Sequence, residues 1–404
     1  MNSQVIKNIF NLGVMRLIGI VSPVILFPYL LNIFGVDNYA TLALSFTLLG
    51  LSSSFISYGF DITGPKSLSQ DSLNANKVLS TILFSKFVLF ILVILTSVSG
   101  FYVASLLSFN VNYYPIIILL FSSIIEVVNP IWYSIYYDKV KIFSLLTVAY
   151  KSLILIFSFT FIKNADDFII FCYIHSALSL FYSLAILLVN VRLFKIGFNH
   201  IYFRRSLIDI KGNFMFFVSR SATVVKDRMG IVILSIFSTP AVVAKYDIIR
   251  KFIDTGLVPF TIVNSVFYPR IIKNQEIQTP LYLSVVSFFV GLICSIILFA
   301  LFYSYSGKYL NISYEIDELS ILLLMPLISA SLFLGNTALA AFGHYKIFNF
   351  GSVASLICFA VLIFIYTYIE GDINFVVFSL ILISNVLFDI LYRLFFIFKL
   401  NFKK

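Results

Sequence analysis

The sequence predicts an all-α integral membrane protein with about twelve transmembrane helices. Its 404 residues are 60% hydrophobic and only 11% charged, and the mean hydropathy is +1.02, values far outside those of soluble proteins. A bilayer core of roughly 30 Å requires about 20 consecutive apolar residues in a helix, and such runs follow one another along almost the whole chain. They leave no segment long enough for a folded soluble domain.

The apolar runs form two sets of six, separated by the longest hydrophilic stretch of the chain. The first set covers residues 9–33, 39–57, 78–100, 114–136, 142–162 and 168–191. The second set covers residues 212–236, 241–268, 281–303, 319–342, 347–368 and 374–397. We therefore expect an N-terminal six-helix bundle (1–195), a cytoplasmic linker (196–211) and a C-terminal six-helix bundle (212–404). The first span lacks a small-residue cleavage site, so we expect it to be retained.

The basic residues of the loops predict the orientation. With the amino terminus in the cytoplasm, nearly all loop Lys and Arg fall on the cytoplasmic side, and only Lys163 and Lys308 fall outside. The outer turns are short and carry acidic residues such as Asp166, Glu315 and Glu370. Both termini are therefore expected in the cytoplasm.

Several other classes of function lack support in the sequence. The formal net charge of +10 does not indicate nucleic-acid binding, because Lys and Arg lie at helix ends or singly within apolar runs. Cys172, Cys294 and Cys358 are far apart, without the spacing of a disulfide framework or a metal site. No P-loop, nucleophile elbow or dinucleotide fingerprint occurs. We expect no catalytic residue, no metal and no cofactor.

Short segments of the two halves resemble each other. NIFGVDNYATLALSF, between the first two spans, parallels SIFSTPAVVAKYDII, between the seventh and eighth, and this match brings Arg16 and Arg220 within one residue of equivalence. Six helices followed by six in the same orientation would be a parallel repeat, which is a common transporter plan.

Charged residues within the spans are the main functional signal. Each costs at least about 2.5–3.5 kcal/mol at mid-bilayer, so these side chains must contact water, a partner or a ligand. The basic ones are Arg16, Lys86, Lys151, Arg220, Lys226, Arg228, Lys245, Arg250 and Lys251, and the acidic ones are Glu126, Asp227, Asp247, Asp254 and Asp389. Snorkelling to the interface explains Lys86, Lys151, Lys226 and Lys245 equally well. Asp389 is expected to pair with Arg393.

One helix face in the span 241–268 concentrates this charge. Asp247, Arg250, Lys251 and Asp254 follow i, i+3, i+4 and i+7 spacing, which places them in one stripe. The basic excess within the spans predicts a wet, net-positive cavity that binds an anion, and Arg in particular binds phosphate through forked hydrogen bonds.

The acids of these spans have two interpretations. They are counter-ions that make the cations tolerable, or they are carboxylates that couple transport to a proton or sodium gradient. Glu126 and Asp227 are the first coupling candidates, followed by Asp247 and Asp254.

Several segments resemble one known family. LFPYLLNIFGVDNYATLALSF and SYGFDITGPKSLSQ are similar to the first two spans of the Wzx-type O-antigen and polysaccharide flippases, members of the multidrug/oligosaccharidyl-lipid/polysaccharide exporter superfamily. NPIWYSIYYDKVKIFSL, AKYDIIRKFID, VFYPRIIK and LLLMPLISASLFLGNTALAAFGHYK resemble later elements of the same family. Lys251 matches a family lysine, whereas Arg250 replaces a residue that is often acidic there.

The resemblance implies two six-helix bundles around a central cationic cavity that opens alternately to each side of the bacterial inner membrane. It implies an undecaprenyl-pyrophosphate-linked oligosaccharide repeat unit as cargo, carried from cytoplasm to periplasm. The pyrophosphate would contact Arg16, Arg220, Arg250 and Lys251, with Lys86, Lys151 and Arg228 as further binding candidates. Partners implied are membrane lipid, a polysaccharide polymerase and a chain-length regulator, but no nucleic acid.

Three other classes of function fit the sequence less well. An O-antigen polymerase or membrane glycosyltransferase has a similar length, but such enzymes usually need a large extracytoplasmic loop. A drug or cation antiporter of the same superfamily would favour an acidic pocket, which the basic excess argues against. A purely structural role gives intramembrane charge no purpose.

Overall fold

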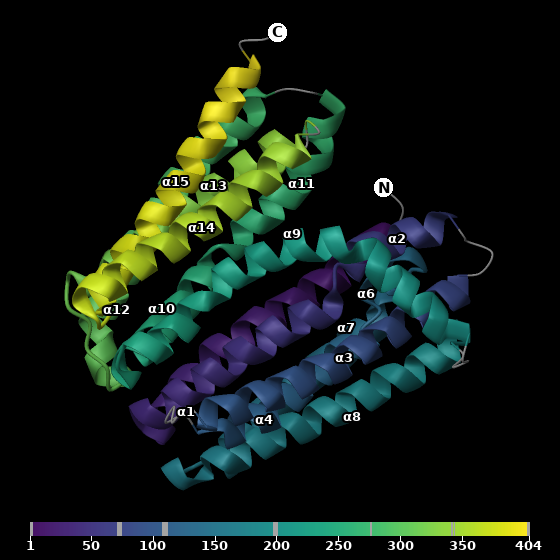
Figure 1. Ribbon diagram of the computed structural model, residues 1–404, viewed down its shortest axis with the longest axis horizontal. Coiled ribbons are helices and arrows are strands. Elements are labelled where there is room, and N and C mark those ends of the chain that lie inside the picture. Colours follow the sequence, from purple (N-terminus) through teal and green to yellow (C-terminus); the bar gives the residue numbers. More distant parts are fainter. Residues whose placement is uncertain are drawn as a thin grey trace. The chain divides into compact units, whose positions relative to one another are not determined.

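The structure is a computed structural model, and every regular element in its described residues is helical (Figure 1). It describes residues 3–70, 75–106, 112–196, 201–274, 277–340, 342 and 344–401. The chain packs as two compact units, Met1–Arg228 and Met229–Lys404, and each is described by itself. Large apolar side chains such as Leu95, Phe181 and Phe289 are exposed on outer helix faces, as expected of surfaces that contact lipid.

Nine helical segments of the described residues are long and apolar enough to cross a membrane, so the chain is a multi-pass membrane protein. The first of them, Phe10–Ser57, has 48 residues and holds two predicted spans. The predicted spans 212–236 and 241–268 are not among the nine. The second of them is divided into two helices of 17 residues each, Pro240–Gly256 and Val258–Asn274. The total of twelve spans stays a prediction.

The N-terminal unit is built from long helices that run side by side (Figure 1). Its elements are α1 (Ser3–Ser57), α2 (Phe60–Gln70), α3 (Ala75–Leu106), α4 (Tyr113–Leu120), η2 (Phe121–Ser123), α5 (Ile124–Val128), α6 (Ile131–Tyr136), α7 (Val140–Phe161), η3 (Ala165–Asp167), α8 (Phe168–Phe194) and α9 (Ile201–Phe237), which continues into the next unit. A buried apolar cluster that includes Ile56, Leu79, Phe90 and Tyr133 forms its core.

A glycine divides α1 at the position where the sequence predicts a turn between two spans. Gly35 has φ 73° and ψ 177°, which is not helical, and this region of backbone conformation is essentially open only to glycine. The division at Gly35 separates the predicted spans 9–33 and 39–57 within one assigned helix.

The C-terminal unit contains two further irregular helices. Its elements after α9 are α10 (Pro240–Gly256), α11 (Val258–Asn274), α12 (Gln278–Tyr309), η4 (Glu318–Leu323), α13 (Leu324–Leu332), η5 (Phe333–Ala340), α14 (Tyr345–Glu370) and α15 (Phe375–Asn401). The predicted span 241–268 is divided between α10 and α11, which meet at Leu257. The predicted span 319–342 begins as a 3₁₀ helix and ends as a π-helix, η5.

The expected linker is partly helical. Residues 201–211 of the predicted linker 196–211 belong to α9, while 197–200 lie outside the described residues. Packing divides the chain within α9, between Arg228 and Met229. The long, continuous α9 therefore carries the chain from one unit to the next.

Candidate functional site

The most irregular span of the N-terminal unit forms one wall of a cavity. The predicted span 114–136 is not one helix: it tightens to 3₁₀ geometry at η2 and breaks at Asn129, whose backbone is extended. Pro130 follows, and its missing N–H cannot continue the helical hydrogen bonds. On α8, the Asn190 side chain donates to the Val128 carbonyl at 2.8 Å and so satisfies one group that the break exposes.

Broken backbone at membrane depth is itself a functional signal. It is tolerated only where it is enclosed by protein or lines a polar cavity, since lipid offers no hydrogen bonds. Within one apolar 18-residue window of each described span, 56% of the residues are buried in the span that contains this break and 67% in η4 with α13 and the start of η5, against at most 50% in the others. The two most irregular spans are thus the two most enclosed.

The cavity has a volume of about 400 Å³ and lies between α1, the broken segment, α7 and α8. Its wall combines charged, amide, hydroxyl and aromatic side chains. The lining residues are Met15, Phe46, Leu49, Ser53, Ser122, Ile125, Glu126, Asn129, Ile131, Phe143, Thr147, Tyr150, Lys151, His175 and Tyr182. A cavity of this size and composition is typical of a small-molecule binding site.

Two predicted site residues line this cavity, and a third reaches into its wall. Glu126 and Lys151 are lining residues, and Lys86 of α3 places its Nζ 2.7 Å from Glu126 Oε1. The Lys86 Nζ also donates to the Glu126 carbonyl at 3.1 Å, and the Lys86 side chain is only 2% exposed. Lys86 is therefore a buried ion-pair partner and does not snorkel.

Lys151 has a different environment. Its Nζ lies 5.4 Å from the centre of the Tyr150 ring, and it forms no ion pair among the described residues. Two lysines, Lys86 and Lys151, thus accompany Glu126, the one acid among the described lining residues. One positive charge is left over at this cavity, where the low dielectric strengthens its attraction to an anion.

Aromatic and hydroxyl groups complete the wall. The rings of Tyr150 and Tyr182 stack with centroids 4.6 Å apart. The Tyr150 hydroxyl lies 2.8 Å from Ser179 Oγ, and the Tyr182 hydroxyl lies 2.9 Å from Thr147 Oγ1. His175 Nδ1 is 3.2 Å from Ser122 Oγ. These hydrogen bonds hold the polar side chains in fixed orientations around the cavity.

Two other predicted cations of the N-terminal unit, Arg16 and Arg228, are not among the described lining residues. Arg16 of α1 is exposed and forms no ion pair among the described residues. Arg228 of α9 lies against Gly50 of α1, where a Cβ would collide with its guanidinium. The side chains of Arg220 and Asp227 lie outside the described part of the structure.

The charged stripe of α10 is neutralised locally. Arg250 Nε lies 2.9 Å from Asp254 Oδ1, and Lys251 forms an ion pair with Asp247, again four residues away on the same helix. Near the start of α10, Lys245 is held by the Glu318 carboxylate at 2.7 Å. The charged stripe that the sequence predicts on this helix is therefore neutral in its described ion pairs.

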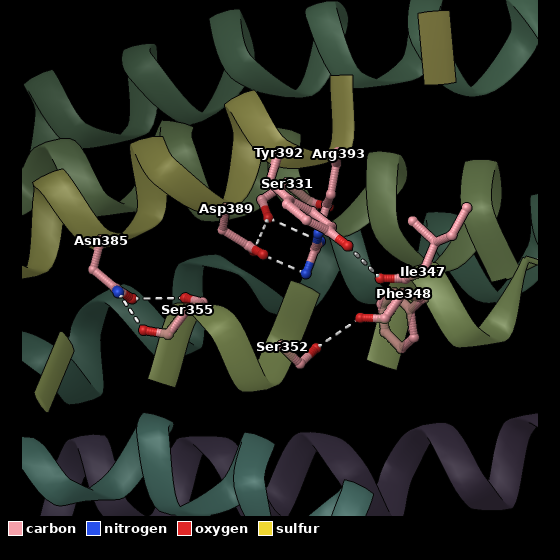
Figure 2. Close-up of polar contacts among 9 residues, drawn as sticks. All are labelled: Ser331, Ile347, Phe348, Ser352, Ser355, Asn385, Asp389, Tyr392 and Arg393. Carbon is pink, nitrogen blue, oxygen red and sulfur yellow. Dashed lines mark hydrogen bonds and ion pairs between the residues drawn. The ribbon is translucent and has the colours of Figure 1, made fainter. Parts of the chain in front are cut away.

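The expected pair of Asp389 and Arg393 is confirmed, with Arg393 Nη2 2.8 Å from Asp389 Oδ2. Figure 2 shows both side chains pointing from α15 toward Ser331 of α13. The Ser331 hydroxyl lies 3.0 Å from Asp389 Oδ2, and Arg393 donates to the Ser331 carbonyl at the point where α13 gives way to the π-helix. One turn away, Asn385 and Ser355 exchange two hydrogen bonds.

Sequence reasoning missed most of the cavity wall. Asn129, Thr147, Tyr150, His175 and Tyr182 line it, yet none was proposed as a site residue. Asn129 had a usable signal, because Asn followed by Pro inside an apolar run marks a helix break. Isolated Tyr, Thr and His residues in membrane helices carry no comparable signal.

Known proteins similar to the chain agree with this architecture. A family model for "Polysaccharide biosynthesis protein" matches residues 5–275. A protein of Escherichia coli K12 described as "Putative O-antigen transporter" is 27% identical over 278 residues, which is 66% of this chain. The chain spans 64% of that relative's length.

Solved structures share the fold. The eukaryotic MATE transporter AtDTX14 superposes with a TM-score of 0.57 and 13% identity, over 98% of this chain and 95% of its own. A second solved chain, protein A, superposes with a TM-score of 0.55 and 17% identity, over 97% and 94%. With the family model covering most of its length, the chain belongs to the polysaccharide biosynthesis protein family.

Proposed function

We propose that the protein is a flippase that moves an undecaprenyl-diphosphate-linked oligosaccharide from the cytoplasmic to the periplasmic face of the bacterial inner membrane. The observation that carries the proposal is a polar cavity with an excess positive charge, enclosed in a membrane-spanning unit. The family, the O-antigen transporter relative and the MATE fold support a transporter of polysaccharide precursors.

The proposed cargo is amphipathic, so its apolar tail and its charged, sugar-bearing part need different surroundings during transport. The polyprenyl tail can stay in the bilayer, while the charged and sugar-bearing part crosses through protein. Arg16 and Arg220 are the proposed diphosphate contacts, because guanidinium binds phosphate bidentately. Arg250 and Lys251 can contribute only where their ion pairs with Asp254 and Asp247 open.

Alternating access is the proposed mechanism, with both termini in the cytoplasm and a proton or sodium gradient as the energy source. Glu126 is the proposed coupling group, since its carboxylate lines the cavity and its charge state sets whether Lys86 keeps a counter-ion. A polysaccharide polymerase and a chain-length regulator are the proposed partners after translocation.

A drug or cation antiporter is the second function compatible with a MATE fold. An organic cation would need an acidic site, whereas the lining acid Glu126 is already paired with Lys86 and the lining also carries Lys151. Cationic cargo is therefore disfavoured by electrostatic repulsion.

The proposed function is tested by deleting the gene in its own host and measuring lipid-linked repeat units on each face of the inner membrane. We expect these units to accumulate on the cytoplasmic face, where a membrane-impermeant sugar-modifying reagent does not reach them in intact spheroplasts. Restoring the gene should remove the accumulation. Accumulation on the periplasmic face would instead indicate a polymerase, and no accumulation on either face would contradict the proposal.

A further inference from the structure

We propose that the N-terminal cavity binds one sugar of the cargo that carries an acidic group, and that Lys151 contacts the acid. This inference rests on the flippase function proposed above and names a substrate feature and a subsite for it. The acidic group is a carboxylate on a sugar of the repeat unit or the phosphate that joins a sugar to the lipid. The two sources share the same chemistry and are separated by experiment below.

The charge balance of the cavity favours binding of an anion. Lys86 and Lys151 share one acid, Glu126, among the described lining residues. If Glu126 turned to Lys151, Lys86 would be left with its 2% exposed side chain buried and without a counter-ion. Either arrangement leaves one lysine without a carboxylate partner, and an unpaired charge in a membrane interior is costly. An anionic ligand removes that cost.

The rest of the wall matches a hydroxyl-rich ring. Asn129 lines the cavity and its amide forms no hydrogen bond among the described residues, so it can both donate and accept. Thr147 and Tyr182 add hydroxyls that are already held in place by each other. A volume of about 400 Å³ falls within the range of roughly 300–1,000 Å³ typical of small-molecule sites and admits about one or two sugar rings.

The stacked tyrosines explain why the acid should reside on a sugar and not on a small inorganic ion. Tyr150 and Tyr182 form an aromatic wall beside Lys151, and aromatic side chains supply a large apolar contact surface next to a polar tip. A bare phosphate or chloride ion would satisfy Lys151 but would leave this wall and the Asn129 amide without a partner. A sugar with an acidic substituent can contact Lys151, the tyrosine wall and the Asn129 amide together.

The binding test uses the purified full-length protein in lipid nanodiscs. Radiolabelled glucuronate, glucose 1-phosphate and glucose are compared by equilibrium dialysis. In parallel, we follow the fluorescence of Trp132, the only tryptophan of the chain, which adjoins the lining residue Ile131. At least one acidic sugar should bind more tightly than glucose. Preference for glucuronate identifies a sugar carboxylate as the natural group, and preference for glucose 1-phosphate identifies a sugar phosphate.

Lys151→Met should weaken binding of the preferred acidic sugar by about tenfold or more, as expected when a charged hydrogen bond is lost, and Lys151→Arg should retain most of it. Lys141→Met is the matched control, because Lys141 is an exposed lysine on the same helix, α7. Melting curves confirm that each variant is folded. Equal binding of all three sugars, or acidic-sugar binding that Lys151→Met leaves unchanged, would overturn the proposal.

A complementation test separates failure of this subsite from failure of the flippase function. In the deletion strain, Lys141→Met should clear the accumulated lipid-linked units and Lys151→Met should leave them on the cytoplasmic face. Full clearance by Lys151→Met overturns the subsite while the flippase function stands. An absence of accumulation in the deletion strain overturns the function itself, whatever the sugars bind.

Discussion

The ion pair of Lys86 and Glu126 joins residues forty positions apart and fixes the charge of the cavity. Lys86 lies on α3, its side chain is nearly inaccessible, and both the carboxylate and the carbonyl of Glu126 accept from it. A buried charge that loses its partner is destabilising by about 3–5 kcal/mol, whereas removing both charges is often nearly neutral. The pair should therefore behave as a unit.

Removing one member of this pair should destabilise the N-terminal unit. We expect Glu126→Gln to lower the free energy of unfolding by about 3–5 kcal/mol, because the buried Lys86 ammonium is left without a counter-ion. Lys86→Met combined with Glu126→Gln should recover most of this loss. Unfolding in mixed detergent, followed by circular dichroism, measures both variants. Equal stability of Glu126→Gln and the unchanged protein would show that Lys86 does not need the carboxylate.

The sequence predicts ion pairs within one helix better than ion pairs between two helices. Asp389 with Arg393 was expected from spacing of four residues and is confirmed. The same spacing joins Arg250 to Asp254 and Lys251 to Asp247, which agrees with the interpretation of these two acids as counter-ions and not with a stripe open to a ligand. The pairing of Lys86 with Glu126 depends on tertiary packing, which spacing along one helix does not encode.

At the scale of elements, Gly35 decides where α1 changes direction. Its backbone lies in a region that is essentially restricted to glycine. A Cβ added at Gly35 would meet no atom within 4 Å. The requirement for glycine is therefore one of backbone conformation, not of space.

Gly35→Ala should consequently lower stability by about 1–3 kcal/mol, the usual cost of backbone strain. Gly19→Ala is the matched control: Gly19 lies in the helical part of α1 and its added Cβ would also meet no atom within 4 Å. That change should be neutral or stabilise by up to about 1 kcal/mol through helix propensity. Thermal melting of the two variants side by side gives the comparison, and equal melting temperatures would contradict the assignment of strain to Gly35.

Irregular helices occupy the same place in both predicted sets of six spans. The fourth span of the first set breaks at Asn129, and the fourth of the second set contains 3₁₀ and π turns in η4 and η5. Both are the most enclosed spans of their units. This shared position supports the weak internal repeat that the sequence suggested, and π-helical turns are frequent at functional sites.

At the scale of the whole molecule, the chain packs as two units with separate cores. The network of Asp389, Arg393 and Ser331 lies wholly in the second unit (Figure 2). The cavity around Lys151 lies wholly in the first. Damage to one of these sites should therefore leave the other intact.

Arg393→Met tests this independence. We expect the buried Asp389 carboxylate, deprived of its partner, to destabilise the protein by about 3–5 kcal/mol, with Lys399→Met, an exposed change on the same helix, as control. Binding of the preferred acidic sugar, read from Trp132, should stay within about twofold of the unchanged protein. A large loss of sugar binding in Arg393→Met would show that the two units are coupled more tightly than their packing indicates.

Hydropathy predicted the fold well and the candidate site poorly, for a physical reason. The apolar runs 78–100, 142–162, 168–191, 281–303, 347–368 and 374–397 correspond to α3, α7, α8, α12, α14 and α15, because lipid imposes helix length directly. The cavity arises where a run stays apolar but its helix breaks, at Asn129. Which side chains then converge depends on packing between α1, α7 and α8, and no local pattern reports that.

The hydrogen bond from Asn190 to the Val128 carbonyl has a consequence for how the cavity is filled. Because the protein itself satisfies the carbonyl at the break, we expect the wall to keep its shape whether or not a ligand is present. Such preorganisation spares binding the entropic penalty of ordering the receptor. The ligand can then bind and leave quickly, because the broken helix around Asn129 does not have to fold or unfold within the membrane at each transport cycle.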